Sequence, residues 1–218
     1  MNKRSVCNEL RKITFDTDLY GNIPVSLFGS FLLGKYGEQL SDDIIDEQHT
    51  NNYFIITLNQ SAPVKREWLN YHFKETEGGR YSSYDGAINL FDIVMPKYKF
   101  LIGSYITDFY KPIYKEIITS DGSQLQKTLS TLKKENKEKY DKYISNCLSI
   151  LDREINTICG DKKPVIIAVG GKTFNALIKF NYDKKYEIFK VLHYTPQACS
   201  FKKEEYKTWG LIPDLTKR

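Results

Sequence analysis

The feature that most constrains the fold is a short, continuously apolar run, VIIAV at Val165–Val169, which ends in a Gly-Gly turn. Because every residue of this run is apolar, both of its faces have to be covered, as in a parallel sheet with helices on either side. Three further β-rich runs lie at residues 53–58, 99–103 and 188–193. We therefore expect an α/β fold, a three-layer α/β/α sandwich with a four-stranded, mainly parallel sheet.

Helical patterns separate these runs. Residues 123–158 carry apolar side chains at three- and four-residue spacing, which predicts a helix, and shorter helices are expected at 171–180 and 202–209. A chain of 218 residues can bury a full core within one domain. We expect a single domain over residues 1–218, with residues 1–50 as an N-terminal helical extension packed on it.

The charge is unevenly distributed along the chain. Residues 162–218 hold 12 basic and 5 acidic residues, whereas the remainder holds 20 basic and 22 acidic residues. A positive excess confined to one region suits a polyanionic partner such as nucleic acid. The alternative is a solvated, lysine-rich face with no partner.

Several classes of protein are disfavoured by what the sequence lacks. No apolar run approaches the roughly 20 residues of a transmembrane helix, and no apolar segment follows the basic N-terminus, so we expect a cytoplasmic protein without membrane contact. The four cysteines form no C-x-x-C pair, and no His/Asp/Glu cluster has ligand spacing. We expect no metal, no cofactor and a monomer.

The ends of the expected strands are rich in polar and small residues. In a parallel sheet the carboxyl ends gather at one edge, where ligands bind. Asn59 follows the first run, Lys172 follows the third, and His193 ends the fourth. Two of them also have a structural interpretation: the Gly-Gly-Lys segment as a tight strand-to-helix turn, and His193 as an ordinary packed histidine. Their expected convergence at one edge favours a single active or binding site.

Four stretches resemble motifs of the uracil-DNA glycosylase superfamily, in the same order along the chain. They are Leu58-Asn59, SYITDFYK at residues 104–111, the helix–strand–helix segment 143–177, and LHYTP at residues 192–196. Together they lie within residues 53–196, about two thirds of the chain. The resemblance implies a base-flipping DNA glycosylase, since the glycosidic bond is inaccessible inside a duplex.

The resemblance also implies roles for individual residues. Asn59 would orient a water against the sugar C1′, and His193 would donate a hydrogen bond to the base oxygen that gains charge. The base pocket would include Leu58, Gln60, Asn89 and an aromatic wall at either Tyr71 or Phe73, although ordinary packing explains these aromatic rings equally well. The expected DNA contacts are Ser61, Gly171, Lys172, Tyr194, Thr195, Gln197, Lys202 and Lys203.

The sequence departs from the superfamily in ways that concern the substrate. Thr57 stands where Gly is usual and Gln60-Ser61 where Pro-Gly is usual, while Tyr194-Thr195 replaces Pro-Ser. These changes permit a deaminated base or a bulkier modified pyrimidine. We predict a monofunctional glycosylase acting on single- or double-stranded DNA, in repair or in defence against phage with modified DNA. The alternatives are a catalytically silent DNA-binding protein of the same fold and an enzyme of free nucleotides.

Overall fold

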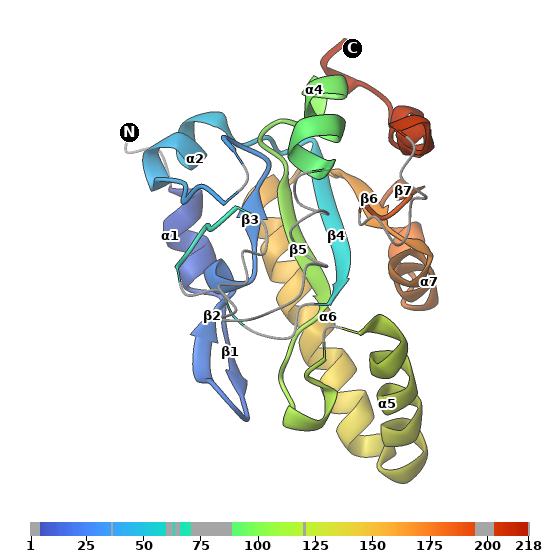
Figure 1. Cartoon of the computed structure of the whole chain (residues 1–218). Coiled ribbons are helices and arrows are strands. Elements are labelled where there is room, and N and C mark those ends of the chain that lie inside the picture. Colours follow the sequence, from blue (N-terminus) through green and yellow to red (C-terminus); the bar gives the residue numbers. More distant parts are fainter. Residues whose placement is uncertain are drawn as a thin grey trace, which may run out of the picture.

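Five strands form the central sheet, in the order β3-β5-β4-β6-β7 (Figure 1). The computed structural model describes residues 5–35, 37–59, 63, 66–70, 89–119, 121–194 and 203–217. The strands are β3 (Ser30–Phe31), β4 (Tyr53–Asn59), β5 (Tyr105–Tyr110), β6 (Val165–Val169) and β7 (Ile188–Val191). The last four are parallel to one another, and β3 pairs antiparallel with β5. The expected α/β class with a mainly parallel sheet is therefore confirmed.

Apolar side chains cover both faces of this sheet. Phe54 and Ile56 of β4 belong to one core cluster, which includes α6, whereas Ile55 and Ile106 belong to a second cluster with η2 and α4. Since successive strand residues point to opposite faces, the two clusters lie on opposite sides of the sheet. Every residue of β6 is buried, which explains why its sequence has no polar alternation.

The helices carry the connections between strands. They are α1 (Val6–Arg11), α2 (Asp42–Gln48), α4 (Met95–Lys97), α5 (Gly122–Glu135), α6 (Lys137–Cys159) and α7 (Gly171–Lys179). A π-helical turn, η2 (Leu90–Val94), precedes α4, and the 3-10 turns are η1 (Val25–Leu27), η3 (Lys99–Leu101), η4 (Lys115–Ile117), η5 (Tyr182–Lys184), η6 (Lys203–Leu211) and η7 (Leu215–Lys217). Across the described ranges, none of the helices combines the length and the apolar character that a membrane crossing needs.

The first 50 residues form strands as well as helices. Besides α1 and α2 they form a hairpin of β1 (Thr14–Thr17) and β2 (Gly21–Pro24), and they supply the edge strand β3. Arg11 joins this region to the segment after β4, because its guanidinium contacts Asp42 at 2.5 Å and Glu67 at 2.6 Å. The N-terminal region is thus packed against the sheet domain (Figure 1).

The second strand lies later in the chain than the sequence indicated. Residues 99–103 were expected to form it, but they form the turn η3, and the strand is Tyr105–Tyr110. The polar Thr107 and Asp108 made this stretch resemble the end of a strand. All six β5 residues are nevertheless buried, with Glu154 of α6 accepting from Tyr105 and Thr107 and Thr57 of β4 donating to Asp108 Oδ1.

Four other expectations need correction. The sheet has five strands rather than four, since the two-residue β3 was not recognised. The expected helix over 123–158 is two helices, because Asn136 ends α5 in an extended conformation and its side chain accepts the Lys139 N–H at 2.9 Å to start α6. The fourth strand stops at Val191, and the last expected helix is the 3-10 turn η6.

Candidate active site at the carboxyl edge of the sheet

The carboxyl ends of β4, β6 and β7 meet at one edge of the sheet. Ile56 lies opposite Ala168, and Val169 lies opposite Val191, so the residues that follow these positions emerge side by side. Asn59, Lys172 and His193 therefore come from three different strand ends at the same edge. The three residues selected from the strand ends thus lie at one edge of the sheet.

Asn59 is the last residue of β4 and is held by the chain before α5. Its side-chain Nδ2 donates a hydrogen bond to the carbonyl oxygen of Thr119. An amide has donors only on nitrogen, so this contact fixes its orientation and makes Oδ1 the acceptor for a water or ligand. The arrangement suits orientation of a water rather than its deprotonation.

His193 lies beside the turn that links β6 to α7. Gly170 in this turn has φ +86°, and a Cβ there would lie 3.7 Å from His193 Cδ2. The Gly170 N–H donates to the Val191 carbonyl at 2.9 Å, which joins the turn to the end of β7. Glycine at this position permits the positive-φ backbone conformation, and the space above it would allow a Cβ an ordinary contact with the imidazole.

Lys172 lies between the N-termini of two helices. It is the second residue of α7, and its Nζ donates to Ser123 Oγ at the start of α5 at 2.6 Å. A Cβ on Gly122 would lie 2.7 Å from Leu58 Cδ2 and 3.8 Å from Lys172 Nζ, so β4, α5 and α7 are in close contact here. The N-terminus of α7 and the ammonium group provide a favourable environment for phosphate, whereas the N–H groups of Ser123 and Gln124 at the start of α5 already donate to Asp121.

Asp108 is a residue of this edge that the sequence analysis missed as a site residue. It lies opposite Thr57, whose hydroxyl donates to Asp108 Oδ1, and it is 1% exposed. Its Oδ2 is buried and has no hydrogen-bond partner within the part of the chain that the structure describes. Burial raises the pKa of this carboxyl to about 6, although the Thr57 hydrogen bond and the charge of Lys111 act in the opposite direction. The sequence feature that could have identified Asp108 as a site residue is an acidic side chain inside a run of strand-forming residues.

A buried ion pair lies on the other face of the same strand. Lys111 Nζ is 2.9 Å from Glu154 Oε2, and both side chains are 0% exposed. Glu154 Oε1 also accepts hydrogen bonds from Tyr105 and Thr107, each at 2.9 Å. Lys111 and Glu154 come from two of the stretches that resemble the glycosylase motifs, so those stretches are joined in space.

Two other predicted residues have structural contacts. Asn89 Nδ2 donates to the Tyr194 carbonyl at 2.9 Å, so its amide nitrogen is already engaged. Tyr194 is 4% exposed and packs in the second core cluster, with its ring 4.7 Å from that of His193. The ring of Tyr194, which was expected to contact DNA, is thus enclosed by protein.

Other predicted residues lie where the structure gives no placement. The residues outside the described ranges are Gln60, Ser61, Tyr71, Phe73, Thr195, Gln197 and Lys202, and the side chain of Lys203 is likewise not described. Leu58 is described and is half-buried against the first core cluster. Of the base pocket predicted from the sequence, the structure describes only Leu58 and Asn89.

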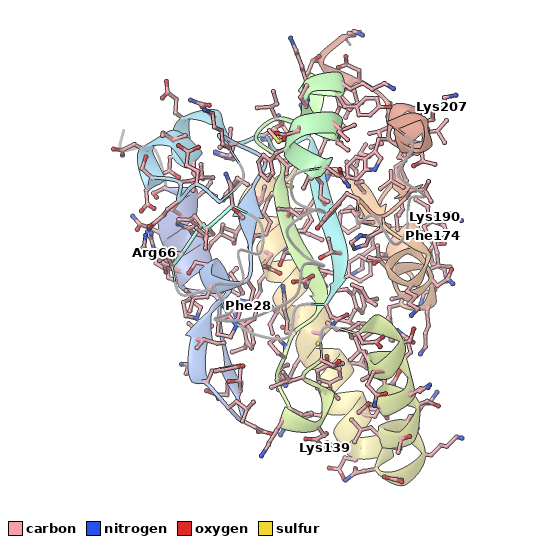
Figure 2. All side chains as sticks on the ribbon, in the orientation of Figure 1. Phe28, Arg66, Lys139, Phe174, Lys190 and Lys207 are labelled. Carbon is pink, nitrogen blue, oxygen red and sulfur yellow. The ribbon has the colours of Figure 1, made fainter. Side chains whose placement is uncertain are left out.

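Exposed lysines gather on the side of the molecule formed by α7, β7 and η6. Figure 2 shows Lys190, Phe174 and Lys207 on this side, and Lys190 Nζ lies 5.6 Å from the centre of the Phe174 ring. The exposed lysines of these elements and of the segment between α7 and β7 are Lys172, Lys179, Lys184, Lys185, Lys190 and Lys207. Lys172 begins α7 at the carboxyl edge, whereas Lys179, Lys184 and Lys185 lie where the chain returns from α7 to the start of β7.

The buried thiols offer no reactive group. Cys7, Cys147 and Cys159 are free and buried, and burial raises the pKa of Cys147 to about 11 and of Cys159 to about 12. Among the described residues, no group of three or more His, Cys, Asp or Glu side chains is arranged to hold a metal ion. The polar groups at the carboxyl edge are therefore the strongest candidates for chemistry.

Comparisons with family models, curated proteins and solved structures find no match to this chain. The geometry of the site combines an oriented amide, an imidazole, a buried carboxyl and an ammonium group between two helix N-termini.

Proposed function

We propose that this protein is a cytoplasmic, monomeric DNA glycosylase that hydrolyses the N-glycosidic bond of a flipped-out pyrimidine and leaves an abasic site. The proposal includes a three-layer α/β/α fold of the uracil-DNA glycosylase type. The observation that carries it is the meeting of Asn59, Lys172 and His193 at the carboxyl edge of the sheet, each from a different strand end. One residue for the water, one for the base and one for a phosphate are the minimum for this reaction.

The chemistry follows from where charge develops. As the bond breaks, the sugar becomes positive and the departing base becomes negative. Asn59 Oδ1 would accept a hydrogen bond from the attacking water and place it against C1′, since Nδ2 is engaged by Thr119. His193 would donate to the base oxygen that gains charge. Lys111 is buried in an ion pair with Glu154, so it is not placed to act as a Schiff-base nucleophile, which supports a monofunctional enzyme.

Asp108 bears on the class of base. Above its pKa of about 6 the Asp108 carboxylate is an acceptor only, and its Oδ1 already accepts from Thr57. Oδ2 could therefore accept a hydrogen bond from the N4 amino group of cytosine, whereas uracil presents an acceptor at O4 that a carboxylate repels. If Asp108 reads the pairing edge of the base, a modified cytosine fits better than uracil. This favours the modified-pyrimidine form of the prediction over the deaminated one.

The lysine-rich side would hold the DNA strands. Lys172 would bind a phosphate next to the flipped nucleotide, and the exposed lysines of β7 and η6 would contact the flanking backbone. Such contacts to phosphate do not depend on the DNA sequence, and they weaken as salt cations compete with the lysines for the phosphates. The affinity for DNA should therefore fall steeply as the salt concentration rises.

Replacing Asn59 by alanine tests the proposal. We expect release of the base to fall by roughly 100-fold, because the water loses its orientation while DNA contacts remain. The measurement is alkali cleavage at abasic sites in end-labelled single- and double-stranded DNA containing uracil or modified cytosines. DNA binding by the same variant, measured by fluorescence anisotropy, should stay within about twofold of the wild type.

Asn156→Ala is a matched control, since Asn156 is an exposed asparagine on α6, away from the strand ends. It should cleave like the wild type. Base release by Asn59→Ala at the wild-type rate would contradict the assignment of Asn59. DNA binding without base release from any substrate would instead support the catalytically silent binding protein.

A further inference from the structure

One turn contacts two groups of the proposed site. We call Thr119 together with Asp121, Gly122 and Ser123 the α5 entry turn. The Thr119 carbonyl accepts the hydrogen bond from Asn59 Nδ2, and the Ser123 hydroxyl accepts one from Lys172 Nζ at 2.6 Å. The residue proposed to orient the water and the residue proposed to bind phosphate are therefore both oriented by this turn.

Asp121 fixes the conformation of the turn. Its Oδ1 accepts the backbone N–H groups of Ser123 at 2.7 Å and Gln124 at 3.2 Å, which makes it the N-cap of α5. The Asp121 N–H donates to Thr119 Oγ1 at 3.1 Å, which connects the cap to the residue that holds Asn59. The hydrogen bonds from Ser123 and Gln124 lower the pKa of Asp121, so the carboxylate is ionised at neutral pH.

The turn lies directly on the end of β4. A Cβ on Gly122 would approach Leu58 Cδ2 to 2.7 Å, and Leu58 immediately precedes Asn59. The absence of a side chain at Gly122 thus allows α5 to begin against the strand end. A shift of the α5 entry turn would move the acceptor of the Asn59 amide with it.

We infer that Asp121 is a positioning residue, which acts on the site through Thr119 and Ser123. Its carboxylate caps the start of α5 and holds Ser123 where it orients Lys172. Its backbone N–H donates to Thr119 Oγ1, which connects this cap to the residue whose carbonyl orients Asn59. An ammonium group has three donors, so Lys172 can keep its bond to Ser123 and still bind a phosphate. The catalytic consequence rests on the proposed glycosylase function, whereas the control of the Asn59 side chain does not.

The first test needs no activity. The side-chain amide of Asn59 gives a pair of ¹H–¹⁵N NMR signals, which can be assigned by their loss in Asn59→Ala. We expect Asp121→Ala to shift or broaden these signals and Asp121→Ser, which can still cap the helix, to restore them. Asn136→Ala is the matched control, because it removes the N-cap of α6 without contacting the turn. Unchanged Asn59 signals in Asp121→Ala would overturn the inference.

The second test uses kinetics to separate the effect on Asn59 from the effect on Lys172. Asp121→Ala should lower kcat by about tenfold or more, because small displacements of a reacting group are costly. Ser123→Ala should mainly raise KM for DNA, by about two- to tenfold, as expected for one lost hydrogen bond. If Asp121→Ala lowers kcat no more than Asn136→Ala, the positioning role is wrong. If the wild type has no activity, the proposed function fails, and the NMR result alone decides the inference.

Discussion

Replacing Lys111 by methionine is expected to lower the free energy of unfolding by about 3–5 kcal/mol, because it leaves the Glu154 carboxylate buried without a counter-charge. Both side chains are 0% exposed, Lys111 Nζ lies 2.9 Å from Glu154 Oε2, and the same Nζ donates to Thr107 Oγ1 at 2.7 Å. Unfolding by urea, followed by circular dichroism at pH 7, measures the change. A loss of this size is a large part of the stability of a typical domain.

The surface pair of Lys139 and Glu116 provides the matched control. Its side chains are 35% and 42% exposed, so Lys139→Met should change the free energy of unfolding by less than about 1 kcal/mol. The double variant Lys111→Met, Glu154→Met removes both buried charges and should recover most of the loss. The double variant remains informative if the single variant does not fold. Equal effects of Lys111→Met and Lys139→Met would refute the prediction.

This ion pair also has a consequence for the site. It fixes β5 to α6 immediately beside Asp108, and the charge of Lys111 lowers the pKa of that carboxyl against the effect of burial. The end of β5 is thus held on one face by the ion pair of Lys111 with Glu154, while its other face carries Asp108. We assign a structural role to Lys111 and a functional role to Asp108, although they are only three residues apart.

The central strands could be predicted because their signals are local. β6 is apolar throughout and matches the expected range, and β4 extends the expected one by a single residue. β5 could not be placed in the same way, since its Thr107 and Asp108 are polar yet buried. Their partners, Glu154 and Thr57, lie 47 and 51 residues away in the sequence, and no local pattern reveals such pairings.

The same distinction applies to the site. Asn59, Lys172 and His193 could be selected because the ends of parallel strands share one edge, which is a rule of topology. Tyr194 could not be judged, since its burial depends on packing against residues from other elements. Asp121 was not selected because a helix cap has the same sequence signature whether or not its turn also contacts a site.

Replacing Asp108 by asparagine is expected to stabilise the protein at neutral and higher pH. The pKa of this carboxyl is raised from 3.8 to about 6 by burial, so the folded state binds the proton more tightly than the unfolded state. The contribution of the protonated Asp108 carboxyl to the free energy of unfolding is fully present below pH 3.8. It is lost as the pH rises through about 6. The ionised carboxylate then costs up to about 3 kcal/mol, a cost that an uncharged amide avoids.

Urea unfolding at pH 4 and pH 8 tests this expectation. Asp108→Asn should gain stability relative to the wild type at pH 8 and show little difference at pH 4. Asp161→Asn, which removes an exposed carboxyl, should leave the pH dependence of the wild type unchanged. An Asp108→Asn variant whose stability follows the wild type at both pH values would show that this carboxyl is not destabilising when ionised.

The same substitution connects stability to function. A buried carboxyl with an oxygen that lacks a hydrogen-bond partner in the described part of the chain is unfavourable for folding, and such groups are concentrated at functional sites. If a base supplies the missing partner, Asp108→Asn should gain stability at pH 8 and lose activity on modified cytosines, with a shift toward uracil, because an amide can donate to O4. A stabilised variant with unaltered base preference would remove Asp108 from the pocket and leave the roles of Asn59 and His193 untouched.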